Sequence, residues 1–376
     1  MKWIMISDPL ICGANFMNDI DERNDKMKLV AVGDVFITPK MMENGISKFK
    51  EMVDDAEIFF FGRNNRKVMR NVVKIIERGG FEDLDVPEGV LQALADADAL
   101  MVHLCPVTKD VLAHAPRLKY VLCNRGGHEN IDLEACRQRG ISVILNPAHN
   151  ANAVAEYTVG LILGELRNIS RSHLALKTGD WREKYPNSGR IIELKDLTVG
   201  VIGFGNIGEL VCEKLASFGC RILVATRHDH PKDNPRINWD KLEFTSFNRV
   251  VTDSDFITVH VRDPRKRVLF GSREFDMMKP TAYFINTARP YVMDYDALYV
   301  ALSENKIAGA AIDVFPKEPL GVTFPLVTCD NVTLTNHRAG DTVNAYSDSP
   351  EMMLDALKAW IENGKTPKFL VGDKPE

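Results

Sequence analysis

The chain has 376 residues, of which 45% are apolar and 26% are charged, and its formal net charge is −5. This length suggests two domains, and the mild negative charge argues against a general nucleic-acid binder. No apolar run approaches the ~20 residues of a membrane-spanning helix, so we expect no membrane partner.

Residues 27–148 alternate between short apolar strands and helical stretches. The expected helices include Arg66–Ile76 and Leu133–Arg139, and the expected strands are Lys28–Val32, Glu57–Phe61, Ala99–His103, Tyr120–Cys123 and Val143–Leu145. This alternation is typical of an α/β fold in which helices cover both faces of a parallel sheet. We therefore expect a doubly wound domain here. Residues 1–26 lack the pattern of a secretory signal, and we expect them to form an N-terminal extension.

One long helix is expected from Asn150 to Lys177, because apolar residues recur there at steps of three and four and no proline interrupts them. A polar loop, 179–196, separates this helix from a second alternating region with helices near 272–278 and 294–304. Its expected strands are Leu197–Ile202, Arg221–Thr226, Phe256–Val261, Ala282–Asn286, Ala308–Val314 and Val332–Thr335. These strands predict a second doubly wound sheet, and a last helix, Pro350–Asn363, lies beyond it.

The stretch 197–227 carries a glycine motif between a strand and an amphipathic helix. Gly203, Gly205 and Gly208 form G-x-G-x-x-G at the point where the helix must begin. Gly203 permits the tight turn, Gly205 lets the backbone approach a pyrophosphate, and Gly208 lets the helix pack closely on the strand. A lone motif of this kind also fits an ordinary turn, but the strand–turn–helix–strand context predicts dinucleotide binding.

Three later strand ends carry residues suited to redox chemistry on an acid substrate. Arg289, Glu318 and His337 each follow an expected strand, and the carboxyl edge of such sheets is where ligands bind. Each residue alone also fits a structural role without function. Arg289 fits a surface arginine, Glu318 a solvated Lys–Glu turn, and His337 a structural histidine. Together they predict a site, because a carboxylate fixes the tautomer of a proton-exchanging histidine and an arginine grips a carboxylate.

Four segments, in order and spacing, resemble the D-isomer-specific 2-hydroxyacid dehydrogenase family. They are GFGNIG at 203–208, MKPTAYFINTAR at 278–289, GAAIDVFPKEP at 309–319 and LTNHRAG at 334–340, and VAEYTVGLIL at 154–163 is similar to the family's interdomain helix. The resemblance implies a flavodoxin-like substrate-binding domain, 27–148 and 342–376, and a Rossmann NAD(P)-binding domain, 149–341. It also implies a homodimer formed through the cofactor domain.

The resemblance also implies roles for individual residues. Arg289 would bind the substrate's carboxylate and carbonyl, Glu318 would support the histidine, and His337 would be the general acid/base. The substrate loop would be Arg125, Gly126 and Gly127, whose backbone N–H groups receive the carboxylate. The expected cofactor contacts, with Asp313 on the nicotinamide carboxamide, are Gly203, Gly205, Asn206, Ile207, Gly208, Thr226, Arg227, His260, Val261, Thr287, Ala288 and Asp313.

The expected activity is hydride transfer between a nicotinamide cofactor and a small polar 2-keto or 2-hydroxy acid. Arg125 and the nearby His128 favour glyoxylate, hydroxypyruvate or a longer sugar-derived acid, unless Arg125 faces solvent or pairs with Glu129. A rival from another class is a cofactor-sensing, corepressor-like interaction protein on the same fold. Formate dehydrogenase is a weaker rival, because its relatives have glutamine where this chain has Glu318. Measured turnover separates the enzyme from the interaction protein.

Three positions depart from the family's pattern. Asn336 replaces a proline before the histidine, Pro290 replaces a glycine, and Arg262 stands where a proline is frequent. Proline at 290 biases Arg289 toward an extended backbone. The basic run Arg262, Arg265, Lys266 and Arg267 is expected to be a solvated loop, and a phosphate contact is the alternative.

The end of the second Rossmann strand predicts the choice of cofactor. NAD-preferring sites place an acid there, about 20 residues past the glycine turn, to bind the ribose 2′-OH. This chain has Thr226, followed by Arg227 and His228, so a 2′-phosphate would be bound with charge assistance. We therefore favour NADP(H) over NAD(H). Asp229, three residues further on, is the counter-evidence.

The cysteines and histidines predict no metal site. Seven scattered cysteines, without a C-x-x-C pair, suggest neither a zinc site nor a disulfide framework, and a reducing cytoplasm is the expected setting. His228 and His230 form H-x-H without a third ligand in view, and are expected to be loop residues.

Overall fold

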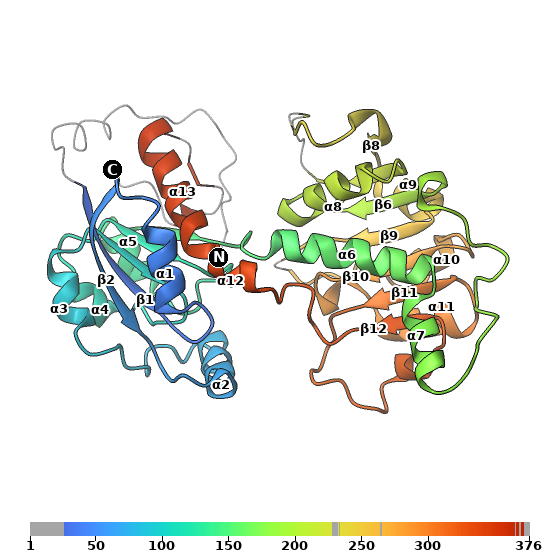
Figure 1. Cartoon of the computed structure of the whole chain (residues 1–376), viewed down its shortest axis with the longest axis horizontal. Helices are drawn as coiled ribbons and strands as arrows, with labels where there is room; N and C mark the ends of the chain where they lie inside the picture. The colour runs from blue at the N-terminus through green and yellow to red at the C-terminus, as the bar shows by residue number, and fades with distance from the viewer. Residues whose placement is uncertain are drawn as a thin grey trace. The chain divides into compact units, whose positions relative to one another are not determined.

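The chain divides into two units in the computed structural model, and each has its own sheet and helices (Figure 1). The structure describes residues 26–227, 232, 234–263, 265–364, 366–367 and 370–371. Unit 1 takes the chain up to Asn146 and from Ser347 onward, and unit 2 is Pro147–Tyr346. The expectation of two doubly wound α/β domains is confirmed at the level of the fold class.

Unit 1 has a six-stranded sheet in the order β13-β5-β4-β3-β1-β2. The strands are β1 (Met27–Gly33), β2 (Val53–Phe60), β3 (Ala99–Val102), β4 (Tyr120–Cys123), β5 (Ser142–Leu145) and β13 (Leu370–Val371). All pair in parallel except β13, which is antiparallel to β5. Without β13 the order is that of flavodoxin-like folds, so the carboxyl ends of β1, β3 and β4 meet at one edge.

The helices of unit 1 are short apart from two. They are α1 (Pro39–Ile46), α2 (Arg66–Glu77), α3 (Val90–Ala93), α4 (Lys109–Ala113), α5 (Leu133–Gln138) and α13 (Ser349–Asn363), with α12 (Val343–Ser347) at the boundary between the units. The last helix belongs to unit 1 because α13 packs on α1 and β5. The two helices approach closely at Gly45, where a Cβ would lie 2.8 Å from the Cβ of Pro350.

Unit 2 has a seven-stranded, all-parallel sheet in the order β12-β11-β10-β9-β6-β7-β8. The strands are β6 (Thr198–Ile202), β7 (Arg221–Ala225), β8 (Leu242–Phe244), β9 (Phe256–Val259), β10 (Tyr283–Asn286), β11 (Gly309–Ile312) and β12 (Val332–Leu334). This is the Rossmann order, and the order in which strands are added to the sheet reverses between β6 and β9. Ile202, the last residue of β6, pairs with Ala225 of β7 and Val259 of β9, so these strands end together.

Two apolar cores lie on the two faces of this sheet, because alternate strand residues point to opposite sides. Ile222 and Val224 of β7 belong to the core under α6 (Ala151–Leu166) and α8 (Asn206–Ala216). Leu223 and Ala225 belong to the opposite core. That core is covered by α9 (Phe247–Asp253), α10 (Ser272–Met277) and α11 (Tyr295–Ser303).

The expected single helix from Asn150 to Lys177 is wrong. The structure divides it into α6 and α7 (Ile169–Lys177), because Asn168 adopts a left-handed conformation with φ of 53°. The side-chain amide of Asn168 donates to Asn187 Oδ1 at 2.6 Å. The side-chain amide of Asn187 donates in turn to the backbone carbonyl of Leu166 at 3.3 Å. Asn187 therefore binds both sides of the break from the following loop.

Several short elements were not predicted from the sequence. They are α1, α3, α4, β8, α9, α12 and β13. Strand β2 begins four residues before its expected start at Glu57, and β7 ends at Ala225, one residue before Thr226. Within the described ranges, the helices are all too short or too polar to cross a membrane.

Candidate functional site

The three glycines of the turn between β6 and α8 differ in how much space a side chain would have. Gly203 has φ of +95°, and a Cβ there would lie 2.5 Å from the carbonyl oxygen of His260. A Cβ at Gly208 would lie 1.9 Å from the carbonyl oxygen of Gly203, whereas a Cβ at Gly205 would meet no atom within 4 Å. Gly203 and Gly208 are therefore required by the fold, and Gly205 leaves open space beside the turn.

The start of α8 offers several backbone donors. Gly205 is its N-cap and supplies no side-chain cap. The N–H groups of Asn206, Ile207 and Gly208 have no acceptor among the described residues. Free N–H groups at a helix start carry partial positive charge and attract anions. The turn lies at the reversal of strand order, and it fits the pyrophosphate of a dinucleotide.

His260 and Val261 line the opposite side of the turn, just after β9. The N–H of His260 donates to the carbonyl of Ile202 at 2.7 Å, which ties the two strand ends together. The Nε2 of His260 lies 3.0 Å from Thr258 Oγ1, and its Nδ1 is buried without a partner among the described atoms. Burial lowers the pKa of His260 to about 3, so the imidazole is neutral at physiological pH.

Glu318 and His337 form a hydrogen-bonded pair after β11 and β12. His337 Nδ1 lies 2.9 Å from Oε2 and 3.1 Å from Oε1 of Glu318. The backbone N–H of Phe315 also donates to Glu318, at 3.1 Å, which fixes the carboxylate. Because an ionised carboxylate only accepts, Nδ1 carries the proton and leaves Nε2 available to a reactant. The sequence-predicted partners are thus in contact.

Arg289 follows β10, the strand beside β11. Its backbone is extended, with φ of −144° and ψ of 146°, as the following Pro290 favours. Asn286 holds the turn by donating to the carbonyl of Arg289 and accepting from the N–H of Ala288. Burial lowers the pKa of Arg289, and the positive charge of the nearby Arg262 lowers it further. Two neighbouring guanidinium groups at a strand edge favour an anionic ligand.

Asp313 is fully buried at the end of β11 and is already engaged within the protein. It accepts from Thr335 Oγ1 at 2.6 Å and from the N–H groups of Arg338 and Ala339 at 2.9 and 3.0 Å. These bonds shape the turn that presents His337, whose φ is 55°. The sequence did not indicate this role. Thr335 was visible only as the residue ending an expected strand.

Thr287, another expected cofactor contact, is buried against the first helix of unit 2. Its hydroxyl lies 2.8 Å from that of Thr158 on α6. The sequence did not identify Thr158. The neighbouring Ala288 is also buried, and its carbonyl accepts from Arg289 Nη1 at 2.8 Å.

The residues expected to select the cofactor are described only in part. Thr226 and Arg227 directly follow β7, and Arg227 is exposed. His228, Asp229 and His230 lie outside the described residues. The loop after β9 contains the buried Asp263, whose pKa is lowered first by the N–H of Arg265, then by Arg267, and more weakly by Arg227. Arg267 contacts Asp263 at 2.6 Å, so this basic run is not wholly solvated.

The expected substrate loop, Arg125 to Gly127, follows β4 in unit 1. Arg125 Nη2 lies 3.7 Å from Glu129 Oε2, so the pairing with Glu129 that the sequence left open is only a long ion pair without a hydrogen bond. Arg125 is only 13% exposed, while Glu129 is 37% exposed. A guanidinium in this loop supplies the positive charge that an acid ligand needs.

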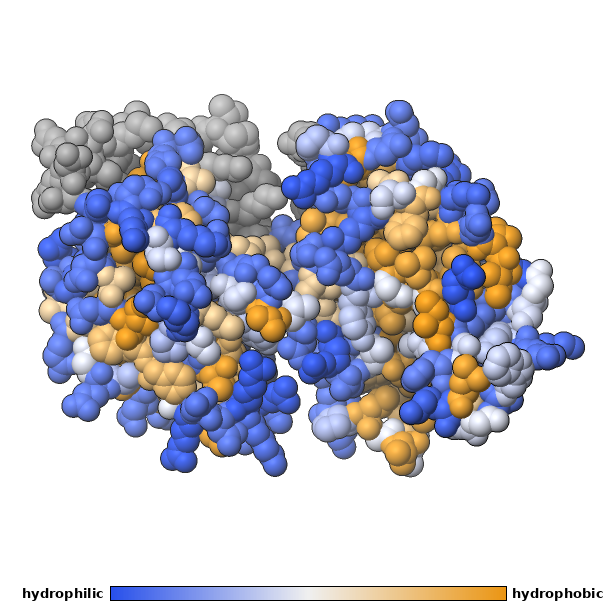
Figure 2. All heavy atoms as spheres, in the orientation of Figure 1, coloured by the Kyte–Doolittle hydropathy of each residue, from blue (hydrophilic) through white to orange (hydrophobic). Residues whose placement is uncertain are grey.

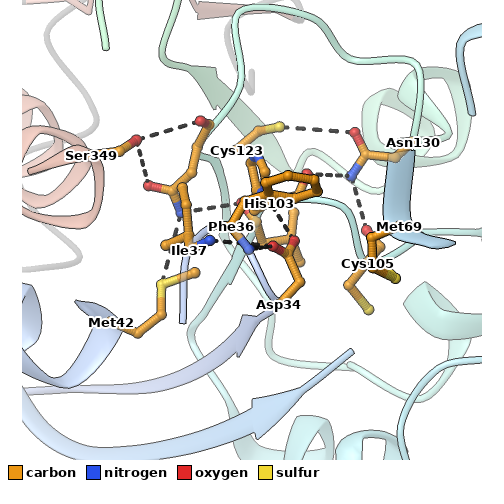
Figure 3. A network of polar contacts seen from close by, with 12 residues as sticks. Asp34, Phe36, Ile37, Met42, Met69, His103, Cys105, Cys123, Asn130 and Ser349 are labelled. Atoms are coloured by element: carbon orange, nitrogen blue, oxygen red, sulfur yellow. Dashed lines mark hydrogen bonds and ion pairs between the residues drawn. The ribbon is translucent and has the colours of Figure 1, made fainter. Parts of the chain in front are cut away.

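A network of buried polar groups lies at the same sheet edge and was not predicted (Figure 3). His103 Nδ1 lies 2.7 Å from Asp34 Oδ2, and Asp34 Oδ1 also accepts from the N–H of Phe36 at 2.8 Å. Asn130 donates to the carbonyl of Cys105 at 2.9 Å, and Ser349 donates to Asn124 at 2.9 Å. These groups satisfy one another, so the network holds the strand ends of unit 1 in place.

Comparisons with known proteins agree with this architecture. Residues 159–339 match the family model described as D-isomer specific 2-hydroxyacid dehydrogenase, NAD binding domain. The chain is 37% identical to the glyoxylate reductase of Thermofilum pendens over 76% of this chain and 84% of that protein. It is 32% identical to the glyoxylate reductase of Thermococcus gammatolerans over 90% of this chain and 95% of that protein.

A solved structure shares the fold over most of the chain. It is the NAD-complexed D-isomer specific 2-hydroxyacid dehydrogenase of Lactobacillus delbrueckii ssp. bulgaricus. Its TM-score is 0.70 and its sequence identity 21%, over 92% of this chain and 99% of that chain.

Proposed function

Because the chain belongs to the D-isomer-specific 2-hydroxyacid dehydrogenase family, we propose that it reduces a small polar 2-keto acid to the 2-hydroxy acid, and catalyses the reverse oxidation, with His337, Glu318 and Arg289 as its catalytic residues. The observation that carries this proposal is the Glu318–His337 pair, at 2.9 Å, on strand ends beside Arg289. The family's NAD-binding domain lies within unit 2, and the glycine turn with its free N–H groups fits the pyrophosphate.

Arg289, His337 and Glu318 each have a separate role in the proposed reaction. A bound nicotinamide supplies the hydride to the carbonyl carbon, or accepts it in the reverse direction. Arg289 binds the substrate's carboxylate and polarises its carbonyl. His337 donates the proton on Nε2 to the carbonyl oxygen as negative charge develops there, and Glu318 stabilises the orientation and the protonated form of the ring. In the oxidation, the same nitrogen removes the hydroxyl proton.

The assignment is tested by replacing His337. We expect His337→Ala to lower kcat by at least about 10²-fold, the usual loss for a general acid. Because His337 has a positive φ, His337→Asn is the better variant: asparagine tolerates that backbone while removing the acid. Cofactor binding, followed by fluorescence, should stay unchanged in both. Undiminished turnover of 2-keto acids would refute the role of His337.

We propose NADP(H) as the preferred cofactor. Thr226 follows β7 at the position where NAD-preferring sites have an acid, and the next residue, Arg227, is exposed and adds its charge to those of the loop that follows β9. The NAD complex of the solved relative is the opposing observation. The ratio of kcat/KM for NADPH to NADH decides between them. Arg227→Ala should lower this ratio, whereas Arg236→Ala, at an exposed arginine paired with Glu213, should leave it unchanged.

We propose that the substrate is small and polar, such as glyoxylate, hydroxypyruvate or a longer sugar-derived acid. Arg125 is largely buried in the loop that would receive the substrate's carboxylate, and a charged side chain there disfavours an apolar substituent. A panel of 2-keto acids assayed with both cofactors tests this. A higher kcat/KM for branched-chain or aromatic 2-keto acids would contradict it. A complete lack of turnover would favour the corepressor-like alternative.

We infer that the cofactor domain pairs with a second copy. Apolar side chains are visible on the face of unit 2 that carries α6 and α7 (Figure 2). The exposed apolar residues of the segment from α7 to residue 192 are Ile169, Leu174, Leu176, Trp181, Ile191 and Ile192. So many in one short segment are typical of an interface. Sedimentation of the purified chain should give a dimer, and Trp181→Lys should weaken it.

We infer a reducing, cytoplasmic setting. The six described cysteines are free thiols, and burial raises the pKa of Cys123 and Cys220 to about 11. Such thiols are unreactive and have a packing role. Fractionation of the native host cells tests this location.

A further inference from the structure

Glu129 and Arg125 form an incomplete ion pair in the loop after β4. Their closest charged atoms, Nη2 and Oε2, are 3.7 Å apart, which is too far for a hydrogen bond. Arg125 Nη1 and Glu129 Oε2 are both buried, and neither has a hydrogen-bond partner among the described residues. The loop thus holds one buried donor and one buried acceptor that do not satisfy each other.

The Glu129 carboxylate rests directly on Gly127. A Cβ at Gly127 would lie 2.1 and 2.6 Å from its two oxygens, so a side chain at position 127 would displace the carboxylate from its present place. The N–H of Gly127 makes no hydrogen bond to any residue that the structure describes. The Glu129 carboxylate therefore lies in the loop that, under the proposed function, contacts the substrate.

We propose that Glu129 is a specificity-determining residue that restricts the Arg125 subsite to hydroxylated 2-keto monoacids and excludes substrates with a second negative charge. This inference rests on the proposed function. Glu129 neutralises Arg125 at short range, and a second carboxylate or a phosphate on the substrate would be repelled by it. A hydroxyl group carries no charge, so Glu129 does not repel it, and it can donate to the partly exposed Glu129 carboxylate. An ionised carboxylate has no proton to donate to Glu129.

The test compares two substrates of similar size in two variants. In the wild type, kcat/KM for hydroxypyruvate should exceed that for oxaloacetate. Glu129→Gln should move the ratio toward oxaloacetate by about tenfold or more, which corresponds to about 1.4 kcal/mol. Glu134→Gln is the matched control, because it makes the same charge change in unit 1 at an exposed residue paired with Arg137. Its substrate ratio should equal that of the wild type.

A binding measurement separates this inference from the proposed function. Calorimetry with the oxidised cofactor present gives the Kd of D-glycerate and D-malate, which model the hydroxylated monoacid and the dicarboxylate. Wild-type protein should bind D-glycerate more tightly, and Glu129→Gln should reduce that preference. Absence of turnover with every 2-keto acid would overturn the proposed function, while the binding ratio would still report on Glu129. Equal affinity of the wild type for both ligands, or an unchanged ratio in a folded Glu129→Gln variant, would overturn the inference.

Discussion

Glu318 accepts hydrogen bonds from His337 Nδ1, at 2.9 Å, and from the backbone N–H of Phe315, at 3.1 Å. The second bond holds the carboxylate in place whether or not the histidine is protonated. The orientation of the His337 ring therefore depends on the segment after β11, which holds Glu318, as well as on the loop that carries His337 itself.

This relationship predicts a graded effect at position 318. Glu318→Gln can still accept from Nδ1, but it removes the negative charge that stabilises the imidazolium. We expect kcat to fall by about tenfold, and to fall further in Glu318→Ala, which removes the acceptor as well. Steady-state kinetics with one 2-keto acid measures both, and cofactor affinity serves as the control. Equal kcat in all three proteins would contradict the pairing.

The three glycines of the cofactor turn should respond differently to alanine. Gly205→Ala should fold normally, since its Cβ meets nothing within 4 Å, but should bind the cofactor more weakly because the methyl group enters the space beside the turn. Gly203→Ala and Gly208→Ala should each be destabilised by about 2 kcal/mol or more, Gly203 through its positive φ and a backbone clash and Gly208 through a backbone clash. Thermal unfolding and cofactor titration of the three variants separate the two effects. Equal melting temperatures would show that the clashes are relieved.

The buried His260 predicts loss of stability on mild acidification. Its folded pKa is about 3 against an ordinary value of 6.5, so below pH 6.5 the unfolded state gains a proton that the folded state does not. Stability is therefore lost as the pH falls from 6.5 toward 3, and this group contributes about 2 kcal/mol of loss between pH 7 and pH 5. Urea unfolding at the two pH values measures it. His260→Gln cannot titrate and should show a smaller loss, and an equal loss would contradict the assignment.

A buried ion pair between α6 and α7 predicts a large, pH-dependent loss in one variant. Glu165 is fully buried and accepts from Arg171 Nη2 at 2.9 Å, and Arg171 Nε donates to the carbonyl of Asp330 at 2.6 Å. Arg171→Met leaves the buried charge without a cation, although the Thr333 hydroxyl still donates to it, and we expect a loss of about 3–5 kcal/mol. The double variant with Glu165→Met should recover much of it. Denaturant unfolding measures both.

The stability of the Arg171→Met variant should change with pH in a defined direction. Burial raises the pKa of Glu165, and Arg171 opposes the rise. Without Arg171 the folded state holds the Glu165 proton to higher pH than the unfolded state, so the stability of Arg171→Met should fall as the pH rises. A loss independent of pH would show that Glu165 keeps another cation partner.

The cofactor turn and the strand-end residues were predictable because their signals are local. Gly203, Gly205 and Gly208 stand between an apolar strand and an amphipathic helix, and the conformation of a tight turn depends on its own few residues. The alternation of strands and helices likewise implied parallel sheets, and with them a shared carboxyl edge for Arg289 and His337.

Packing between segments distant in sequence decided the rest. The helix from Asn150 breaks at Asn168 because Asn187, in a later loop, bonds both sides of the break, and no periodicity in the helix itself reports this. The incomplete pairing of Arg125 with Glu129 depends on how their loop folds over Gly127. Hydrophobic periodicity specifies which face of an element is buried. The partner of a buried polar group is fixed only when neighbouring elements close around it and exclude water, because an unpaired donor or acceptor is then strongly unfavourable.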